Sequence, residues 1–166
     1  MENELYVRPL EDGDAEKASM ILIAAFKGFL KDKFDDSLTV HFSPDVLKEE
    51  ARSKDKHGFS ESRIFTAVNN GEVVGVVKVT AGKSGLGVFD YVGVDPESPA
   101  RGIGSLLMRK AEDFWKERNQ RKIHTCVSAH NKKALLYYIK NDFRPKGYCK
   151  DHFHEGVDEI MLGRFL

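Results

Sequence analysis

The stretch from Tyr91 to Arg109 constrains the fold most, because it joins the end of a strand, a turn and the start of a helix. Val92 and Val94 end a β-rich run, and two prolines interrupt the chain directly after it. Apolar residues then recur at helical spacing, which predicts a helix from Gly104 to about Arg118. The members of this apolar stripe are Ile103, Leu106, Leu107, Ala111, Phe114 and Trp115.

Two glycines at the start of this predicted helix indicate a seat for an anion. Glycine has no Cβ, so the backbone can approach a ligand closely. The unpaired N–H groups of the first turn and the positive end of the helix dipole favour a phosphate or pyrophosphate there. We expect backbone amides to form the seat, with Gly104 the position least able to carry a large substituent. The predicted seat comprises Ala100, Arg101, Gly102, Ile103, Gly104 and Ser105.

Two familiar phosphate-binding turns fit this stretch poorly. A Walker loop needs a Lys-Ser/Thr pair after its second glycine, and Ser105-Leu106 does not supply it. A dinucleotide fingerprint needs a glycine or alanine three residues after its second glycine, and that position is Leu107.

Two sequence blocks together resemble the GNAT acetyltransferases. The first runs Val92-Gly93-Val94-Asp95-Pro96-Glu97, then Arg101-Gly102-Ile103-Gly104, then Leu106-Leu107, and is similar to the acetyl-CoA loop of that superfamily. The second is Asn131-Lys132-Lys133-Ala134 followed by Tyr138 and Phe143, at the spacing of the family's Asn-x-x-Ala, Tyr and Gly-Phe pattern. Two positions depart from that pattern: Pro99 replaces the usual Gln or Arg, and Asp142 replaces the usual glycine, which predicts an altered turn before Phe143.

The order of predicted elements agrees with this resemblance over nearly the whole chain. We expect a strand, two helices, three strands, a helix, a strand, a helix and two strands. The fold class is α/β (α+β): a single domain spanning residues 1–166, with a mixed, mostly antiparallel sheet of about seven strands and helices on both faces. The resemblance implies a splayed parallel strand pair, with the pantetheine arm of acetyl-CoA in the gap.

The predicted boundaries follow from turn and capping signals. The expected elements are a strand at 5–8, a helix from about 15 to 29, a loop or helix end at 31–39, a helix starting at Ser43-Pro44, a loop at 54–60, a hairpin of 64–68 with 73–79 around Asn69-Asn70-Gly71, a loop at 81–87, strands at 88–94 and 122–129, a helix from Asn131 to about 140, and strands at 143–150 and 159–165.

The resemblance also implies roles for individual residues. Backbone N–H groups near Val92 and Val94 are expected to bind the pantetheine and to polarise the thioester, and Asn131 to hold the pantetheine or to cap its helix. Tyr138 lies where the family has the tyrosine that protonates the departing thiolate, a task that suits a phenol with a pKa of about 10. Tyr137 is expected to point elsewhere on the helix.

Two residues compete for the role of general base. Asp90 lies four residues before Val94, so on a regular strand it shares a face with Val92 and Val94. His130 follows the next strand, and its unperturbed pKa of about 6.5 suits proton transfer. We favour Asp90 as the base.

Two other clusters carry weaker signals. His152 and His154 alternate as on one strand face, but without a clear third ligand a metal site is not expected. Cys126 with His124 could form a nucleophile and base, but a small cysteine in mid-strand is more often a packing residue. The two cysteines have no metal-ligand spacing, which favours a reduced, cytoplasmic setting.

Composition limits the class of protein. The 26 basic and 26 acidic residues balance, which argues against a dedicated nucleic-acid-binding protein. No apolar run has the length of a membrane span, and the acidic N-terminus is unlike a signal peptide.

We therefore expect an N-acetyltransferase that moves an acetyl group from acetyl-CoA to a primary amine of a small molecule or peptide, by direct attack and without metal. Two alternatives stay open: a non-catalytic acyl-CoA-binding or sensing domain on the same fold, and a nucleotide-binding regulator. The acceptor is expected to contact the N-terminal helices and segments 31–60, 81–87 and 148–157. A homodimer is possible.

Overall fold

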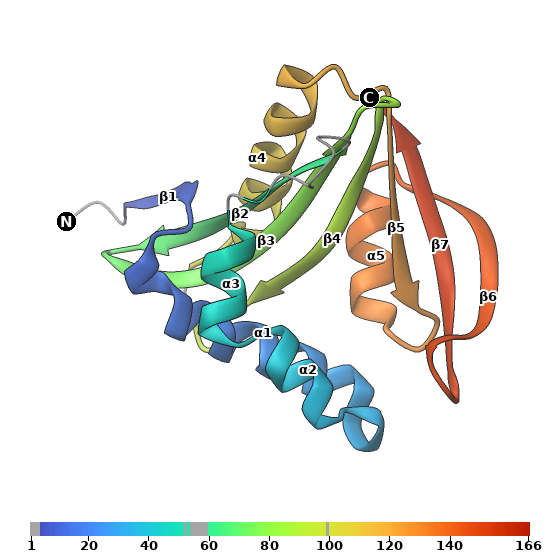
Figure 1. Ribbon diagram of the computed structural model, residues 1–166, viewed down its shortest axis with the longest axis horizontal. Helices are drawn as coiled ribbons and strands as arrows, with labels where there is room; N and C mark the ends of the chain where they lie inside the picture. Colours follow the sequence, from blue (N-terminus) through green and yellow to red (C-terminus); the bar gives the residue numbers. More distant parts are fainter. Residues whose placement is uncertain (1–3, 52, 54–59, 99) are drawn as a thin grey trace.

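The computed structural model describes residues 4–51, 53, 60–98 and 100–166, and Figure 1 shows the path of the chain. The elements, in order, are β1 (Leu5–Pro9), the 3₁₀ turn η1 (Asp12–Asp14), α1 (Ala15–Leu30), the 3₁₀ turn η2 (Lys31–Lys33), α2 (Asp36–His41), α3 (Pro44–Glu50), β2 (Ser60–Asn69), β3 (Glu72–Gly82), β4 (Leu86–Val94), α4 (Ile103–Glu117), β5 (Lys122–Ser128), α5 (Lys132–Lys140), β6 (Arg144–His154) and β7 (Val157–Phe165).

The strands form one mixed sheet in the order β1-β2-β3-β4-β5-β7-β6. Five of the six neighbouring pairs are antiparallel, and β4 with β5 is the parallel pair. The predicted fold class, a mixed and mostly antiparallel seven-stranded sheet with helices around it, is confirmed.

The parallel pair separates soon after it forms. Pairing joins residues 86–88 of β4 to residues 122–124 of β5, but both strands continue for several residues beyond it. Figure 1 shows the two strands diverging, with α5 beside β5. A β-bulge accompanies the separation, because the register of β3 against β4 shifts between Lys78 and Val79 and leaves Asp90 as the extra residue.

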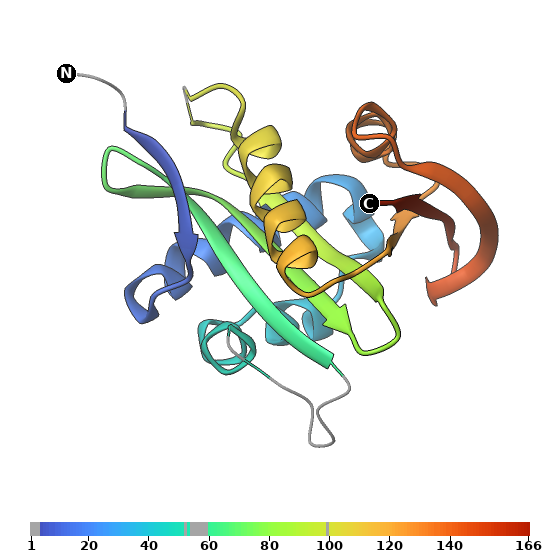
Figure 2. The same ribbon diagram turned by 90° about the horizontal axis from the view of Figure 1, so that it is seen from above.

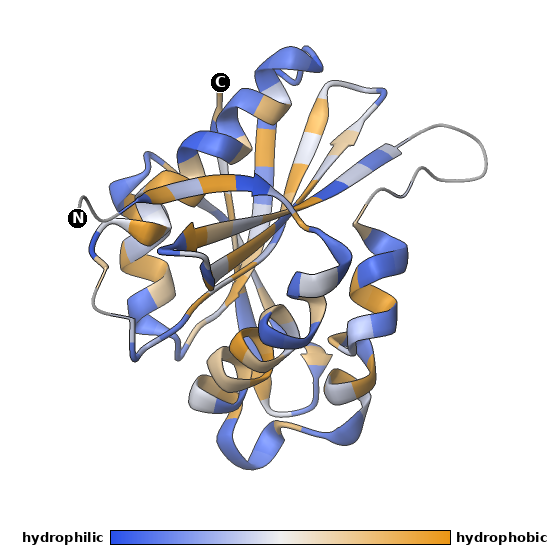
Figure 3. Cartoon of the chain, turned by 90° about the vertical axis from the view of Figure 1, so that its left-hand side faces the viewer, coloured by the Kyte–Doolittle hydropathy of each residue, from blue (hydrophilic) through white to orange (hydrophobic). Residues whose placement is uncertain are grey.

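Helices cover both faces of the sheet, and each face has its own core. On the α1–α3 face, residues of α1 and α3 such as Leu22 and Leu47 pack with Val76 and Tyr91 of the sheet. On the α4–α5 face, residues of α4 and α5 pack against the other side of the strands, with Trp115 and Leu107 fully buried. Figure 2 shows α4 and the N-terminal helices on opposite sides of the sheet, and Figure 3 shows apolar residues along the strands.

Local signals explain most of the element boundaries. Asn70 and Gly71 both have positive φ, at 50° and 84°, and connect β2 to β3 in the predicted hairpin. Asn131 caps α5, since its side chain accepts a hydrogen bond from the amide of Ala134 at 3.1 Å. None of the described helices is long and apolar enough to cross a bilayer.

Three boundary predictions are wrong in detail. Residues 36–41 form α2 within the segment predicted as a loop or helix end, and its N-cap Asp35 accepts from the amide of Ser37 at 2.8 Å. Strand pairing takes up most of the loop predicted at 81–87, because β3 runs to Gly82 and β4 begins at Leu86. The last two strands reach His154 and Val157, so the predicted hairpin tip is shorter. Most of the loop predicted at 54–60 lies outside the described residues.

Gly87 lies where α4 meets the start of the parallel pair, and we expect an alanine there to be costly. A Cβ at this position would lie 2.7 Å from Ile123 Cδ1 and 2.8 Å from Trp115 Cδ1. Overpacking of this kind costs about 1–3 kcal/mol. Gly28→Ala is the matched control, because Gly28 is helical with no atom within 4 Å of its added Cβ. That change should stabilise the protein by up to about 1 kcal/mol. Urea unfolding measures both; equal stability of the two variants would contradict this packing.

Candidate functional site

The N-terminus of α4 presents the predicted glycine turn. Gly102 is its N-cap, with a left-handed φ of 78°, and a Cβ there would meet no atom within 4 Å. The first intrahelical bond runs from the amide of Leu106 to the carbonyl of Gly102, so the amides of residues 103–105 precede it. The amide of Ala100 instead donates to Ser98 Oγ at 3.3 Å, and Arg101 is exposed. Pro99, the departure from the family pattern, lies outside the described residues.

Gly104 is constrained by a tyrosine as well as by the turn. The hydroxyl of Tyr137 donates to the carbonyl of Gly104 at 2.8 Å, and a Cβ on Gly104 would lie 3.1 Å from the Tyr137 ring. Tyr137 therefore joins α5 to the first turn of α4, a contact that helix spacing alone did not predict.

Tyr138 lies in the core behind the separating strands. It is 4% exposed, and its ring packs edge-on against Phe89 of β4 and Phe143, with centroids 5.2 and 5.3 Å away. Its hydroxyl interacts with the side chain of Thr125 on β5. Burial, reinforced by Tyr137, raises the pKa of Tyr138 well above its usual value, so the phenol stays protonated and can donate a proton or hydrogen bond.

Thr125 marks the point where the strands part. Its hydroxyl donates to the carbonyl of Phe89 at 2.8 Å, one residue beyond the last paired position of β4. A side-chain hydrogen bond thus replaces the backbone hydrogen bonds between β4 and β5 at this point. Nothing in the local sequence distinguishes this threonine from any other strand threonine.

Asp90 does not share a face with Val92 and Val94, and the prediction that it does is wrong. The bulge shifts the alternation of β4, so that Val92 packs on the α4–α5 face while Asp90 lies on the α1–α3 face. Its carboxylate accepts from Thr80 Oγ1 at 2.8 Å.

The environment of Asp90 suits a proton acceptor. The side chain reaches solvent, but surrounding protein atoms remove much of its hydration. This desolvation raises the pKa of Asp90 to about 6, against the opposing effects of Lys78 and Thr80. Lys78 is itself paired with Glu50 of α3 at 2.9 Å, which limits its influence.

The far end of β4 leaves its backbone accessible on the side of β5. Val92 is partly buried against the core, and Val94 is 37% exposed. Beyond Val88, no pairing of β4 with β5 exists among the described residues. The edge of β4 that carries the predicted pantetheine contacts therefore faces the gap between the strands.

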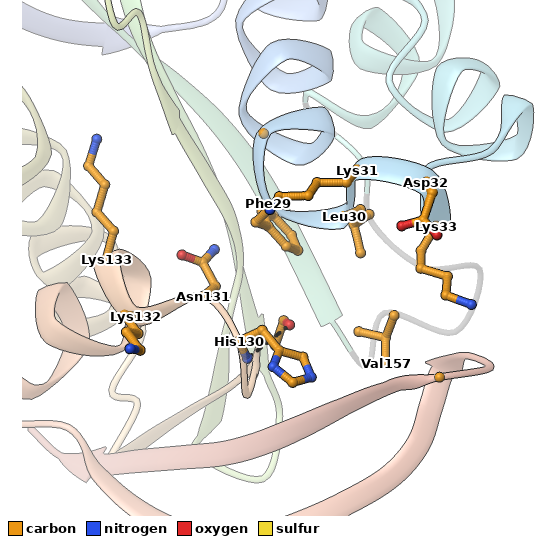
Figure 4. A pocket seen from close by; sticks show the side chains of 13 residues that line it. Phe29, Leu30, Lys31, Asp32, Lys33, His130, Asn131, Lys132, Lys133 and Val157 are labelled. Carbon is orange, nitrogen blue, oxygen red and sulfur yellow. Dashed lines mark hydrogen bonds between the residues drawn. The ribbon is translucent and has the colours of Figure 1, made fainter.

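An open pocket of about 570 Å³ lies where the end of α1 approaches the end of β5. Figure 4 shows Phe29 and Leu30 of α1 above, His130 and Asn131 after β5 below, and Val157 of β7 at one side. Of the segments expected to bind the acceptor, residues 31–33 and 156–157 line this pocket, while 81–87 do not. Residues 28–30, at the end of the first N-terminal helix, line it as well, and the N-terminal helices were also expected to contact the acceptor.

The turn before Phe143 keeps the shape that a glycine would give. Asp142 has a φ of 64°, in the left-handed region that aspartate tolerates better than most residues. The amide of Phe143 still bonds to the carbonyl of Tyr138 at 3.1 Å, and Phe143 is buried. The departure from the family pattern therefore leaves the turn in place.

Among the residues with described positions, no group of three or more His, Cys, Asp or Glu side chains could hold a metal ion. Nδ1 of His154 lies 3.9 Å from Oδ2 of Asp35, and Cys126 and Cys149 are free thiols, not a disulfide. Burial raises the pKa of Cys126, which makes its thiol a weaker nucleophile at neutral pH.

The sequence comparisons concern acetyltransferases. A family model described as the acetyltransferase (GNAT) family matches residues 29–143. An uncharacterized N-acetyltransferase of Methanocaldococcus jannaschii is 27% identical over 156 aligned residues, covering 81% of this chain and 67% of that protein.

Solved structures share the fold. The PaiA N-acetyltransferase of Thermoplasma acidophilum, crystallised with coenzyme A, superposes with a TM-score of 0.79 at 15% identity over 98% of this chain and 99% of its own. The ribosomal-protein-S18-alanine N-acetyltransferase of Escherichia coli gives 0.73 at 16% identity, over 98% and 94% of the two chains. With its family model spanning more than half of the sequence and its separated β4–β5 pair, this chain belongs to the GNAT acetyltransferase family.

Proposed function

We propose that this protein is an acetyl-CoA-dependent N-acetyltransferase acting on a primary amine. The observation that carries the proposal is the juxtaposition of the first-turn amides of α4, which precede the first intrahelical bond, with the edge of β4 that has no strand partner among the described residues beyond Val88. Tyr138 lies protonated behind this edge. A coenzyme A complex of a structural neighbour supports the choice of donor.

The chain offers a fitting cradle for coenzyme A. Open space over Gly102 lets pyrophosphate oxygens approach the amides of residues 103–105, where the helix dipole favours negative charge. The exposed edge of β4 near Val92 and Val94 can pair with the amide groups of the pantetheine arm, as an added strand would. Asn131 caps α5 with its side-chain carbonyl oxygen, and its NH₂ group makes no hydrogen bond within the described part of the chain, so this group can bind the same arm.

The residues around the gap can then accept and donate the protons that direct transfer of the acetyl group requires. Asp90 accepts a proton from the ammonium form of the acceptor, and the neutral amine forms a C–N bond to the thioester carbon. As the C–S bond breaks, the hydroxyl of Tyr138 stabilises or protonates the departing thiolate. The second proton of the amine nitrogen then returns to the Tyr138 oxygen or passes to the thiolate, and Asp90 releases its proton to water, giving an amide and free coenzyme A. Backbone N–H groups of β4 polarise the thioester carbonyl. His130, in the pocket, is the rival base.

The carboxyl group of Asp90 and the phenol of Tyr138 lie close enough to interact electrostatically, since the charge of Asp90 contributes to the raised pKa of Tyr138. The pocket beside α1 opens next to Asn131 and supplies room for the acceptor. The alternative is a non-catalytic acyl-CoA-binding role. It predicts saturable acetyl-CoA binding without transfer of the acetyl group to any amine, whereas the proposed function predicts both.

Acetyl-CoA binding should depend on the charge next to the glycine turn. Ser105 is exposed in the first turn of α4, so Ser105→Glu puts a carboxylate at the seat without removing packing. A glutamate in this turn favours the helix, but it should weaken acetyl-CoA binding by about tenfold or more through repulsion of the phosphates. Ser105→Gln, of equal size and uncharged, should bind within about threefold of the original protein. Calorimetry measures both; equal binding by the two variants would contradict this seat.

Loss of the Tyr138 hydroxyl should slow transfer and leave binding intact. We expect Tyr138→Phe to lower kcat by about 100-fold, the usual scale of a general acid, while the Kd for acetyl-CoA stays within about twofold. A screen of primary amines that follows thiol release provides the rate. Tyr6→Phe, on the exposed part of β1, should keep full activity. A Tyr138→Phe enzyme with unchanged kcat would exclude the phenol from proton transfer.

Asp90→Asn should lower the rate of transfer and raise the stability of the folded protein at alkaline pH. Transfer by the original protein should rise with pH to a plateau above about 6, where Asp90 is ionised, and the variant should lose both this limb and most of its rate. The folded pKa is raised, so ionising Asp90 costs folding free energy as pH rises from about 4 through 6. The variant should therefore be more stable at pH 8 by about 1 kcal/mol after solvent screening, and show no gain at pH 4. Urea unfolding at the two pH values checks this; a stability gain of the same size at both would contradict it.

A further inference from the structure

Glu159 is a buried carboxyl group for which the structure shows no partner. It lies on β7, opposite Ser128 of β5 and Cys149 of β6, and is 8% exposed. No hydrogen bond or ion pair to its side chain exists among the residues described. A buried charge is costly unless it is paired, so an unpartnered carboxyl group in a strand calls for an explanation.

The side chain lies on the α1–α3 face of the sheet. Ile160 and Leu162, its alternating neighbours on β7, pack on the α4–α5 face, so Glu159 and Val157 lie on the other side. Val157 and Ser128, one on the same strand and one directly across from Glu159, both line the pocket beside α1. Glu159 therefore lies on the face on which the acceptor would approach.

Asp90 lies on this same face, across the gap. Asp90 is two residues beyond the paired Val88, which puts it level with Cys126 on β5. Glu159 is one strand further, beside Ser128. Neighbouring strands are about 4.8 Å apart, so the two carboxyl groups are separated by two strand spacings or more, on the order of 10 Å.

No cation offsets the burial of Glu159. Desolvation alone raises the pKa of Glu159 to about 7, and no basic side chain of the described chain lowers it. The pocket is also lined by lysines, but none of them forms an ion pair with Glu159 among the described residues. Glu159 in turn makes the thiol of Cys126 on β5 harder to ionise, which raises the pKa of that thiol.

We propose that Glu159 binds a second cationic group of the acceptor, so that the preferred acceptors carry an ammonium or guanidinium group on the order of 10 Å from the reacting amine. This inference rests on the acetyltransferase function proposed above. The incoming cation supplies the missing partner of the carboxylate, and a charge-assisted hydrogen bond to it is stronger than a neutral one. A purely structural role would make binding and transfer indifferent to a second positive charge on the acceptor.

The test compares two amines of equal chain length, 1,7-diaminoheptane and heptylamine, at saturating acetyl-CoA and about pH 8.5, where Glu159 is ionised. We expect kcat/KM for the diamine to exceed that for the monoamine by about tenfold or more, the scale of one charged hydrogen bond. Glu159→Gln should reduce this ratio to about 1 and leave acetyl-CoA affinity unchanged. Glu72→Gln removes the same charge from the exposed start of β3, outside the site, and should keep the ratio.

Calorimetry of diamine binding, with and without coenzyme A, tests whether Glu159 binds the second cationic group even where transfer is slow. Diamine binding that is tighter than heptylamine binding and is lost in Glu159→Gln supports the role of Glu159. Equal binding of the two amines, or a diamine preference that survives in Glu159→Gln, overturns it. Failure to bind acetyl-CoA would instead overturn the proposed function, while the calorimetric comparison of the amines would still judge Glu159.

Discussion

The early separation of β4 from β5 is the constraint on which the rest of the site depends. The strands pair over three residues each. Beyond them, the hydroxyl of Thr125 donates a hydrogen bond to the carbonyl of Phe89, in place of a backbone amide. An unpaired strand edge inside a protein carries polar groups that need partners. The gap is therefore both a cost to the fold and an opening in which an extended amide-containing ligand can complete the ladder.

Aromatic packing keeps the gap from closing. Phe89, Tyr137 and Tyr138 contact one another edge-on behind the strands, and Tyr137 also bonds to the first turn of α4. The helix after β4 and the helix after β5 are thereby fixed to each other across the opening. The same cluster buries Tyr138 and keeps its phenol protonated, so the packing that shapes the opening also sets the chemistry available in it.

The sequence predicted the parts of this arrangement that are local. Apolar spacing located α4, the Asn-Gly pair located the β2–β3 hairpin, and Asn131 was correctly taken as a helix cap. The seven-stranded mixed sheet followed from a family resemblance, because strand order depends on contacts between segments far apart in the chain.

What could not be predicted depends on register and on long-range contacts. One extra residue at the β4 bulge reverses the strand alternation, so the simple period-two rule assigned Asp90 to the wrong face. Glu159 was missed because its isolation appears only when β5, β6 and β7 are side by side. Asp142 shows the reverse case: a substitution that predicted an altered turn, yet adopts the backbone conformation of a glycine.

We propose that the first turn of α4 and the unpaired edge of β4 form one acetyl-CoA site. Amide hydrogen exchange with and without acetyl-CoA tests it most directly. We expect bound acetyl-CoA to slow exchange in two separate segments, residues 89–94 and 103–106, and to leave the β2–β3 hairpin turn unaffected as an internal control. Protection at residues 103–106 alone, or no protection in either segment at saturating acetyl-CoA, would contradict it.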